Sequence, residues 1–151
     1  RGGHREDGLM GRPMGDAERR GFLMAGTRTG MLATVRRDGS PHVAPIWFVL
    51  DGDDVVLTTG ATTTKGRNLR RDPRACLVVD DPRPPFGFVR IDGEAELSDD
   101  PGAMLEWATR IAARYMGPDL AERYGRRNAV PGELLVRVRP RRIVSEAGVA
   151  D

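Results

Sequence analysis

Cysteine and histidine are scarce in this chain of 151 residues. Cys76 is the single cysteine, so no disulfide can form within the chain, and a reducing compartment such as the cytoplasm is expected. Its apolar neighbours in the run ACLVV indicate a buried, unreactive thiol rather than a nucleophile. The only histidines are His4 and His42, which are too few for a zinc site, so we expect no metal.

Aromatic residues and long apolar runs are also lacking. The two Trp, two Tyr and four Phe do not alternate with the arginines, and the net charge is only +2. Nucleic-acid binding is therefore not expected. No apolar stretch approaches the ~20 residues of a membrane span, and no signal-peptide pattern is visible. These absences favour a cytoplasmic protein with neither a nucleic-acid nor a membrane partner.

The rest of the composition fits one folded domain after a short arm. Residues 1–15 are rich in glycine and charge, and we expect them to be a flexible N-terminal arm. Residues 16–151 have the length of one domain, with no internal repeat. Hydrophobic residues make up 39% of the chain, which is enough to build a core.

Short apolar and β-branched runs separated by turn residues predict mainly strands in this domain. Asp38 and Gly39 mark a hairpin turn, since Asp-Gly supplies the positive φ that a tight turn needs. The expected strands cover 30–36, 42–50, 54–59, 75–79, 86–92 with a bend at Gly93 into 94–97, and 134–139. Helices are expected at 17–25, after the threonines 62–64, at 101–116 with Asp100 as its cap, and at 119–127. The pattern predicts a mainly β (α+β) fold, a small barrel of six strands with flanking helices.

Lys65 is the only lysine among twenty-four basic residues. It follows the strand 54–59, a break at Gly60 and three threonines that can cap a helix. The free N–H groups and the positive dipole end of such a helix attract an anion, and a lysine ammonium suits a phosphate. Lys65 and Asn68 are three residues apart and share a helix face. The alternative is a solvated basic helix capped by threonine. The P-loop motif is absent.

The second expected strand is apolar on both of its faces. One face can fill the barrel, while the other can meet a helix, a partner chain or a ligand. Pro45 removes a ladder donor and therefore belongs at an edge or a bulge. Trp47 and Phe48 either wall a planar heterocycle or fill the core.

Three segments together resemble a known family. They are GMLATVRRDGSPHVAPIWFVLDGDDVVLTTG, TTTKGRNLRRDPRACLVVDD and FVRIDGEAEL. Their order and spacing are similar to those of the pyridoxamine 5′-phosphate oxidase-like split barrels. More narrowly, they resemble the actinobacterial flavin/deazaflavin oxidoreductases of the B group. The stretch KxxNLRRDPR beginning at Lys65 is the most specific part of the resemblance.

The resemblance implies an FMN-binding split-barrel fold and a homodimer with cofactor sites at the subunit interface. It implies coenzyme F420, a deazaflavin, as the cofactor, with FMN as the alternative. Lys65 and Asn68 would hold the cofactor phosphate, and Pro45, Ile46 and Trp47 would lie along the ring system. Neighbouring donors to the phosphate would come from Thr58, Thr59, Thr63 and Thr64. Arg67 and Arg71 would either meet the acidic glutamate tail of F420 or form a solvated basic face.

The function expected from the resemblance is hydride transfer between the deazaflavin and a conjugated or heterocyclic small molecule. Tetrapyrroles such as biliverdin are among the candidate substrates of the group. The alternatives are an FMN-dependent enzyme of the pyridoxamine-phosphate-oxidase type and a non-catalytic cofactor carrier. No catalytic residue is assigned, because the cofactor supplies the chemistry. Tyr115 and Tyr124 are the available proton donors.

Overall fold

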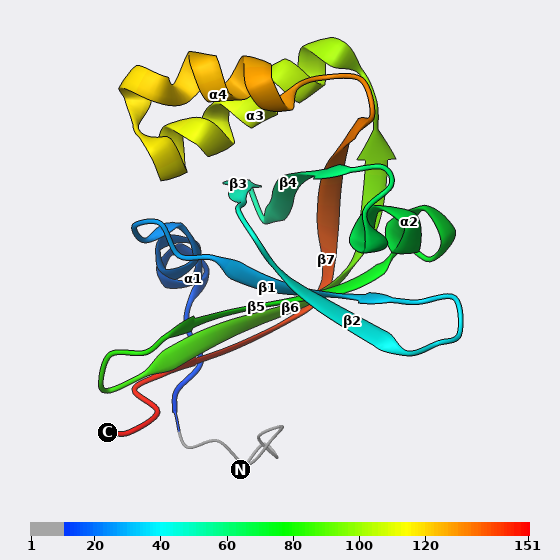
Figure 1. Cartoon of the computed structure of the whole chain (residues 1–151). Coiled ribbons are helices and arrows are strands. Elements are labelled where there is room, and N and C mark those ends of the chain that lie inside the picture. Colours follow the sequence, from blue (N-terminus) through cyan, green and yellow to red (C-terminus); the bar gives the residue numbers. More distant parts are fainter. Residues whose placement is uncertain (1–10) are drawn as a thin grey trace.

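The structure, a computed structural model, describes residues 11–151. Within that range seven strands form one antiparallel sheet in the order β2-β1-β5-β6-β7-β4-β3 (Figure 1). The strands are β1 (Gly30–Val35), β2 (Pro41–Ile46), β3 (Val49–Asp51), β4 (Asp54–Gly60), β5 (Arg74–Asp81), β6 (Gly87–Ser98) and β7 (Glu133–Ala147). The flanking helices are α1 (Asp16–Met24), α2 (Thr64–Arg71), α3 (Pro101–Met116), the short 3-10 helix η2 (Pro118–Leu120) and α4 (Ala121–Asn128). The predicted mainly β class is confirmed.

The prediction of six strands in a barrel is corrected, because the described residues form seven strands and the sheet does not close. The expected strand 42–50 is in fact two strands. Ile46 at the end of β2 pairs with Gly30 of β1, whereas Val49 at the start of β3 pairs with Val56 of β4. These partners stand at opposite ends of the sheet order, so the chain must leave one ladder before it joins the other (Figure 1).

The two long strands β6 and β7 link the two halves of the sheet. β6 pairs with β7 along its whole length, while β5 adds to the first half of β6 and β4 adds to the first half of β7. A register shift between Asp92 and Gly93 bends the ribbon opposite Pro140. A Cβ on Gly93 would lie 2.5 Å from the carbonyl oxygen of Arg139, so the bend requires glycine. The predicted bend at Gly93 is confirmed, within one continuous strand rather than between two.

The apolar side chains divide into two clusters. The larger one fills the inside of the sheet and includes the fully buried Phe48, Leu57 and Val136. The smaller one lies between α3 and the strands β3, β4 and β7, with Trp107 and Val56 among its members. α3 begins where the sequence predicts, because the Asp100 carboxylate accepts a hydrogen bond of 2.8 Å from the Ala103 N–H.

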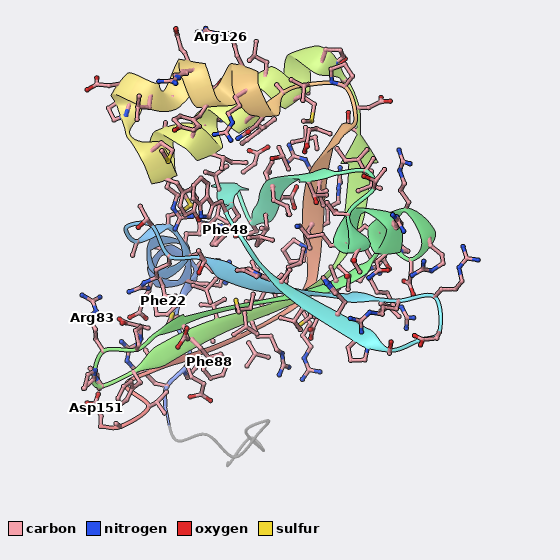
Figure 2. The ribbon with its side chains drawn as sticks, viewed as in Figure 1. Phe22, Phe48, Arg83, Phe88, Arg126 and Asp151 are labelled. Carbon is pink, nitrogen blue, oxygen red and sulfur yellow. The ribbon has the colours of Figure 1, made fainter. Side chains whose placement is uncertain are left out.

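The C-terminal end of α3 ties together three separate parts of the chain. The guanidinium of Arg114 donates to the carbonyl oxygens of Leu23, Gly26 and Phe48 at 2.8, 3.0 and 2.6 Å. Its side chain also lies over the ring of Phe48, 4.7 Å from the centroid. Phe48 is labelled in Figure 2, between α1 and α3. α3 therefore holds both the turn after α1 and the connection between β2 and β3.

The start of the described chain lies against its end. Arg12 forms a bridge with Ala147 of β7, and the Met14 N–H donates to Ser145 Oγ at 2.9 Å. Residues 1–10 of the predicted arm lie outside the described residues, and the division into an arm and a domain 16–151 stays a prediction. Within residues 11–151, no helix combines the length and the apolar composition that crossing a bilayer requires.

Candidate functional site

The connection from β4 to α2, residues 60–66, is built around the hydroxyl of Thr63. This hydroxyl accepts a hydrogen bond from the Gly66 N–H at 3.1 Å and donates to the Gly60 carbonyl oxygen at 2.8 Å. The hydroxyl oxygens of Thr59 and Thr63 are 3.0 Å apart and hydrogen-bonded. Thr63 is thus the N-cap of α2, as the threonine run predicts, and the two hydroxyls are used within the chain.

Gly66 allows α2 to begin directly against the end of β4. It is buried, and a Cβ added to it would lie 2.2 Å from the Gly60 carbonyl oxygen and 3.1 Å from Thr63 Oγ1. Any side chain there would collide with backbone, which cannot rotate away. We call residues 60–66 the α2 cradle.

The α2 cradle presents hydrogen-bond donors that have no acceptor in the described part of the chain. The Gly66 N–H is satisfied by Thr63, and the Arg67 N–H bonds to the Thr63 carbonyl oxygen. The N–H groups of Thr64 and Lys65 lack such partners within residues 11–151. The exposed Thr64 hydroxyl and the half-buried Lys65 side chain stand at the same positive end of the helix. This set of donors fits an anion such as a phosphate.

Asn68 is placed differently from the expectation that it binds phosphate directly. Its side chain is 3% exposed, and its Nδ2 donates to Thr34 Oγ1 of β1 at 3.0 Å. Its Oδ1 accepts from Arg71 Nη2 at 3.0 Å, and Arg71 also donates to the Val35 carbonyl oxygen. Asn68 therefore fixes α2 on β1, which sets the direction of the α2 cradle.

Five arginines surround a hollow of about 660 Å³ beside the α2 cradle, and we call it the arginine hollow. Two come from the turn between β1 and β2 and three from α2, and Thr64 and Asn68 complete the lining. Within residues 11–151, the guanidinium groups of Arg37, Arg67 and Arg70 make no hydrogen bond or ion pair, and all three residues are exposed. The hollow is lined by Arg36, Arg37, Thr64, Arg67, Asn68, Arg70 and Arg71.

Trp47 lies apart from the α2 cradle, in the connection between β2 and β3. Its indole is 45% exposed and stacks on the Tyr115 ring of α3, with centroids 4.8 Å apart and planes inclined by 2°. The Tyr115 hydroxyl donates to the Arg28 carbonyl oxygen at 2.8 Å, and burial raises the pKa of this phenol. Trp47 thus has one supported face and one face available to a planar ligand.

Three other residues predicted to contact the cofactor, Pro45, Ile46 and Thr58, do not share one side of the sheet. Pro45 is exposed on the edge strand β2, where its missing donor is harmless, as predicted. The Ile46 side chain is buried, at 5% exposure, and belongs to the large core, so only the backbone of this residue is left to lie along a ring. Thr58 is half-buried, and strand alternation turns it away from Thr59 toward the side of α3.

Glu133 was not predicted, yet it reaches the α2 cradle. It is the first residue of β7 and pairs with Gly60, the last residue of β4. Burial raises the pKa of its carboxyl group, and the positive charge of Lys65 opposes that shift. Glu133 comes 68 positions after Lys65 in the sequence, so only the register of β4 against β7 reveals the proximity.

The outward face of β1, β2 and β5 is unusually apolar. The register places Ala33 between Val43 and Cys76, and Met31 between Pro45 and Val78. Met31 is 47% exposed and Val43 58%, and a hollow of about 430 Å³ lies on the same face. We call the surface formed by Met31, Ala33, Val43, Pro45, Cys76 and Val78 the outward face.

Cys76 on this face is only partly buried, which corrects the prediction of a buried thiol. Partial burial, together with a hydrogen bond to Asp92, raises the pKa of the thiol to about 11, so it is predominantly protonated near neutral pH. Within residues 11–151 no group of three or more potential metal ligands occurs.

Comparisons with known proteins relate the chain to one family and to several solved structures. A family model described as pyridoxamine 5′-phosphate oxidase matches residues 16–145. A conserved hypothetical protein of Mycobacterium tuberculosis is 31% identical, with a TM-score of 0.81 over 97% of this chain and 91% of that one. A solved F420 reductase is 28% identical, with a TM-score of 0.64 over 87% of this chain and 98% of that one. An FAD-binding protein of Mesorhizobium loti, at 21% identity and a TM-score of 0.64 over 91% and 96% of the two chains, shares the fold.

Proposed function

Because the chain belongs to the pyridoxamine 5′-phosphate oxidase family, we propose that it is an oxidoreductase that uses coenzyme F420. The family match bears out the resemblance predicted from the segments between residues 30 and 97. The proposed reaction is hydride transfer between the deazaflavin and a conjugated or heterocyclic small molecule. The observation that carries the proposal is the α2 cradle, where the single lysine of the chain lies beside N–H groups that have no acceptor among residues 11–151.

The α2 cradle is proposed to hold the cofactor phosphate. Lys65 supplies the charge, and the N–H groups of Thr64 and Lys65 supply directed hydrogen bonds. Thr59 and Thr63 shape the cradle through their mutual hydrogen bond and do not contact the ligand. Asn68 acts as a positioning residue, since both ends of its amide are bound within the chain.

The arginine hollow favours F420 over FMN. The glutamate tail of F420 carries several carboxylates, whereas FMN ends at its phosphate. The guanidinium groups of Arg37, Arg67 and Arg70 make no hydrogen bond or ion pair with any other described residue, so their charges are available to such a tail. The F420 reductase among the similar structures supports the same choice.

The ring end of the site is proposed to lie along Pro45 and Trp47. Stacking on Tyr115 fixes the plane of the indole, so the exposed face of Trp47 can orient a planar ring without first ordering itself. When bound, the deazaflavin supplies or accepts the hydride. Pro45 and Trp47 orient the ring and keep water away from one side of it.

A homodimer is proposed to complete this site. The outward face exposes contiguous apolar side chains beside Trp47, as expected of a surface that another chain covers. We expect light scattering to give twice the 16.6 kDa mass of one chain. Val43→Arg is expected to give monomers, because it puts a charge into the covered surface.

Val130→Arg is the matched control for the dimer. Val130 is also an exposed valine, at 45%, but it lies between α4 and β7, away from the outward face. This variant should remain dimeric. A monomeric parent protein, or a dimer that persists in Val43→Arg, would exclude the outward face as the interface.

Binding and turnover distinguish the candidate functions. The apo-protein is titrated with F420 and with FMN while fluorescence is followed, and reduced F420 is then mixed with conjugated acceptors, biliverdin among them. Tighter binding of F420 with acceptor-dependent oxidation supports the proposal. Tighter FMN binding favours a pyridoxamine-phosphate-oxidase type of enzyme. Tight F420 binding without oxidation by any acceptor favours a cofactor carrier.

Lys65→Ala tests the α2 cradle directly. We expect the dissociation constant for F420 to rise roughly 10- to 100-fold, because a charge-assisted contact to the phosphate is lost. The fold should be unaffected, since the Lys65 side chain is not part of either core. Arg126→Ala, which removes an equal charge from the outer side of α4 (Figure 2), should leave the constant unchanged. Equal affinity in Lys65→Ala and the parent would remove Lys65 from the site.

A further inference from the structure

Glu133 brings a negative charge to the rim of the α2 cradle. Its Oε1 lies 3.7 Å from the point that a Cβ on Gly60 would occupy, on the same side as the Thr63 methyl group. Gly60 and Glu133 are a register pair, and Lys65 stands in the first turn of the helix that follows Gly60. The carboxylate therefore belongs to the surroundings of the one lysine, although Glu133 starts a different strand.

The Glu133 carboxylate has no hydrogen-bond donor and no ion pair within residues 11–151, although it is half-buried. Several other acidic side chains of the chain differ in this respect. Glu94 and Glu96 on β6 each hold an arginine of β7, at 2.7 and 2.8 Å. The pKa of the Glu133 carboxyl is raised by burial, and Lys65 is the cation that counteracts the rise. Glu133 acts on the α2 cradle through its charge rather than through a contact.

We propose that Glu133 makes the α2 cradle select a singly charged phosphodiester over a doubly charged phosphomonoester. The proposal rests on the cofactor site proposed above and names a specificity-determining residue for it. A phosphodiester has one ionised oxygen, whereas a phosphomonoester carries about −1.5 to −2 charges at neutral pH. A fixed negative charge nearby repels the second kind of group about twice as strongly as the first.

The two candidate cofactors differ in this property. The phosphate of F420 is a diester that links the ribityl chain to the glutamate tail, and the phosphate of FMN is a terminal monoester. The cradle itself offers one lysine and two N–H groups, opposed by one carboxylate, so the charges of Lys65 and Glu133 cancel there. The arginines that can meet further ligand charge line the neighbouring hollow rather than the cradle. Glu133 would thus weaken the binding of the FMN phosphate more than that of the F420 phosphate, independently of the arginine hollow, which attracts the tail.

Glu133→Gln tests this inference, with the dissociation constants of F420 and FMN measured by calorimetry for the full chain. Removing the charge of Glu133 is expected to tighten binding roughly three- to fivefold for each negative charge on the ligand phosphate. An effect of this size is typical of two charges several ångströms apart in a half-exposed site. The constant for F420 should therefore fall about three- to fivefold and that for FMN about tenfold or more. The test of the inference is the ratio of the dissociation constant for FMN to that for F420.

Two further variants separate the charge from other effects. Glu133→Asp keeps the charge and should keep the parent ratio. Glu122→Gln makes the same chemical change on an 85%-exposed side chain of α4 and should change neither constant. Two results for Glu133→Gln would overturn the inference: a ratio of dissociation constants equal to that of the parent protein, or weaker binding of both cofactors. The proposed function stands in either case if F420 binding still depends on Lys65. A parent protein that binds neither cofactor would overturn both.

Discussion

Replacing Gly66 with alanine is expected to lower the free energy of unfolding by about 2–3 kcal/mol and to abolish F420 binding. The added Cβ would lie 2.2 Å from the Gly60 carbonyl oxygen, and neither atom belongs to a flexible side chain. α2 must then move away from the end of β4, which removes the Thr63 cap and the arrangement of donors at Lys65. Urea denaturation gives the stability and titration with F420 gives the affinity.

Gly21 of α1 provides the matched control, because it is also a helical glycine. Nothing lies within 4 Å of the Cβ that Gly21→Ala would add. In an open helix position this change stabilises a protein by about 0.5–1 kcal/mol. The same substitution is thus expected to have opposite signs at the two sites. A stabilised Gly66→Ala variant with intact F420 binding would contradict the close contact between α2 and β4.

Arg114→Met is expected to lower the free energy of unfolding by about 3 kcal/mol, since hydrogen bonds to charged groups contribute about 1.5–3 kcal/mol each and are not additive. The change removes the side-chain donor of the Leu23 and Gly26 carbonyl oxygens and leaves the Phe48 carbonyl oxygen with only the 3.3 Å bond from the Tyr115 hydroxyl. Methionine retains much of the side-chain volume, so the loss reports on hydrogen bonding. Burial lowers the pKa of Arg114, but the guanidinium stays charged at any pH that the folded protein tolerates.

Arg110→Met, one turn earlier on α3, controls for the loss of an arginine from this helix. Arg110 is exposed and pairs only with Glu106 of the same helix, at 2.9 Å, besides lying over the Trp107 ring. Exposed pairs of this spacing contribute about 0.3–0.5 kcal/mol. Comparable losses in the two variants, measured by urea denaturation with unchanged slopes, would show that the three carbonyl bonds do not stabilise the fold. A large loss in Arg114→Met alone would support them.

Local chemistry made much of the fold predictable. The Asp100 cap of α3, the turn at Gly39 and the Thr63 cap of α2 each depend on a few consecutive residues, and the structure has all three. The bend at Gly93 was also visible, because an isolated glycine within a strand pattern marks a bulge. These features arise where the chain interacts with itself over short distances.

Features that depend on long-range pairing were not predictable. The break at Trp47 and Phe48 exists because β2 and β3 have partners at opposite ends of the sheet, which the apolar run 42–50 does not indicate. Asn68 of α2 is buried where it bonds to Thr34 of β1, 34 residues earlier in the chain. Glu133 enters the site through the register of β4 with β7. Residue types identified the candidate chemistry, but pairing decided which side chains are free to perform it.

The long ribbon of β6 and β7 has a consequence for how the molecule loses its structure. β5 and β1 depend on β6, and β4 and β3 depend on β7, so each half of the sheet is anchored to the same pair of strands. Neither half can melt as a separate unit while the other persists. The chain should therefore denature in one cooperative step, and a cofactor bound at the α2 cradle, next to the end of β4, would protect amides as far away as β5 from solvent exchange.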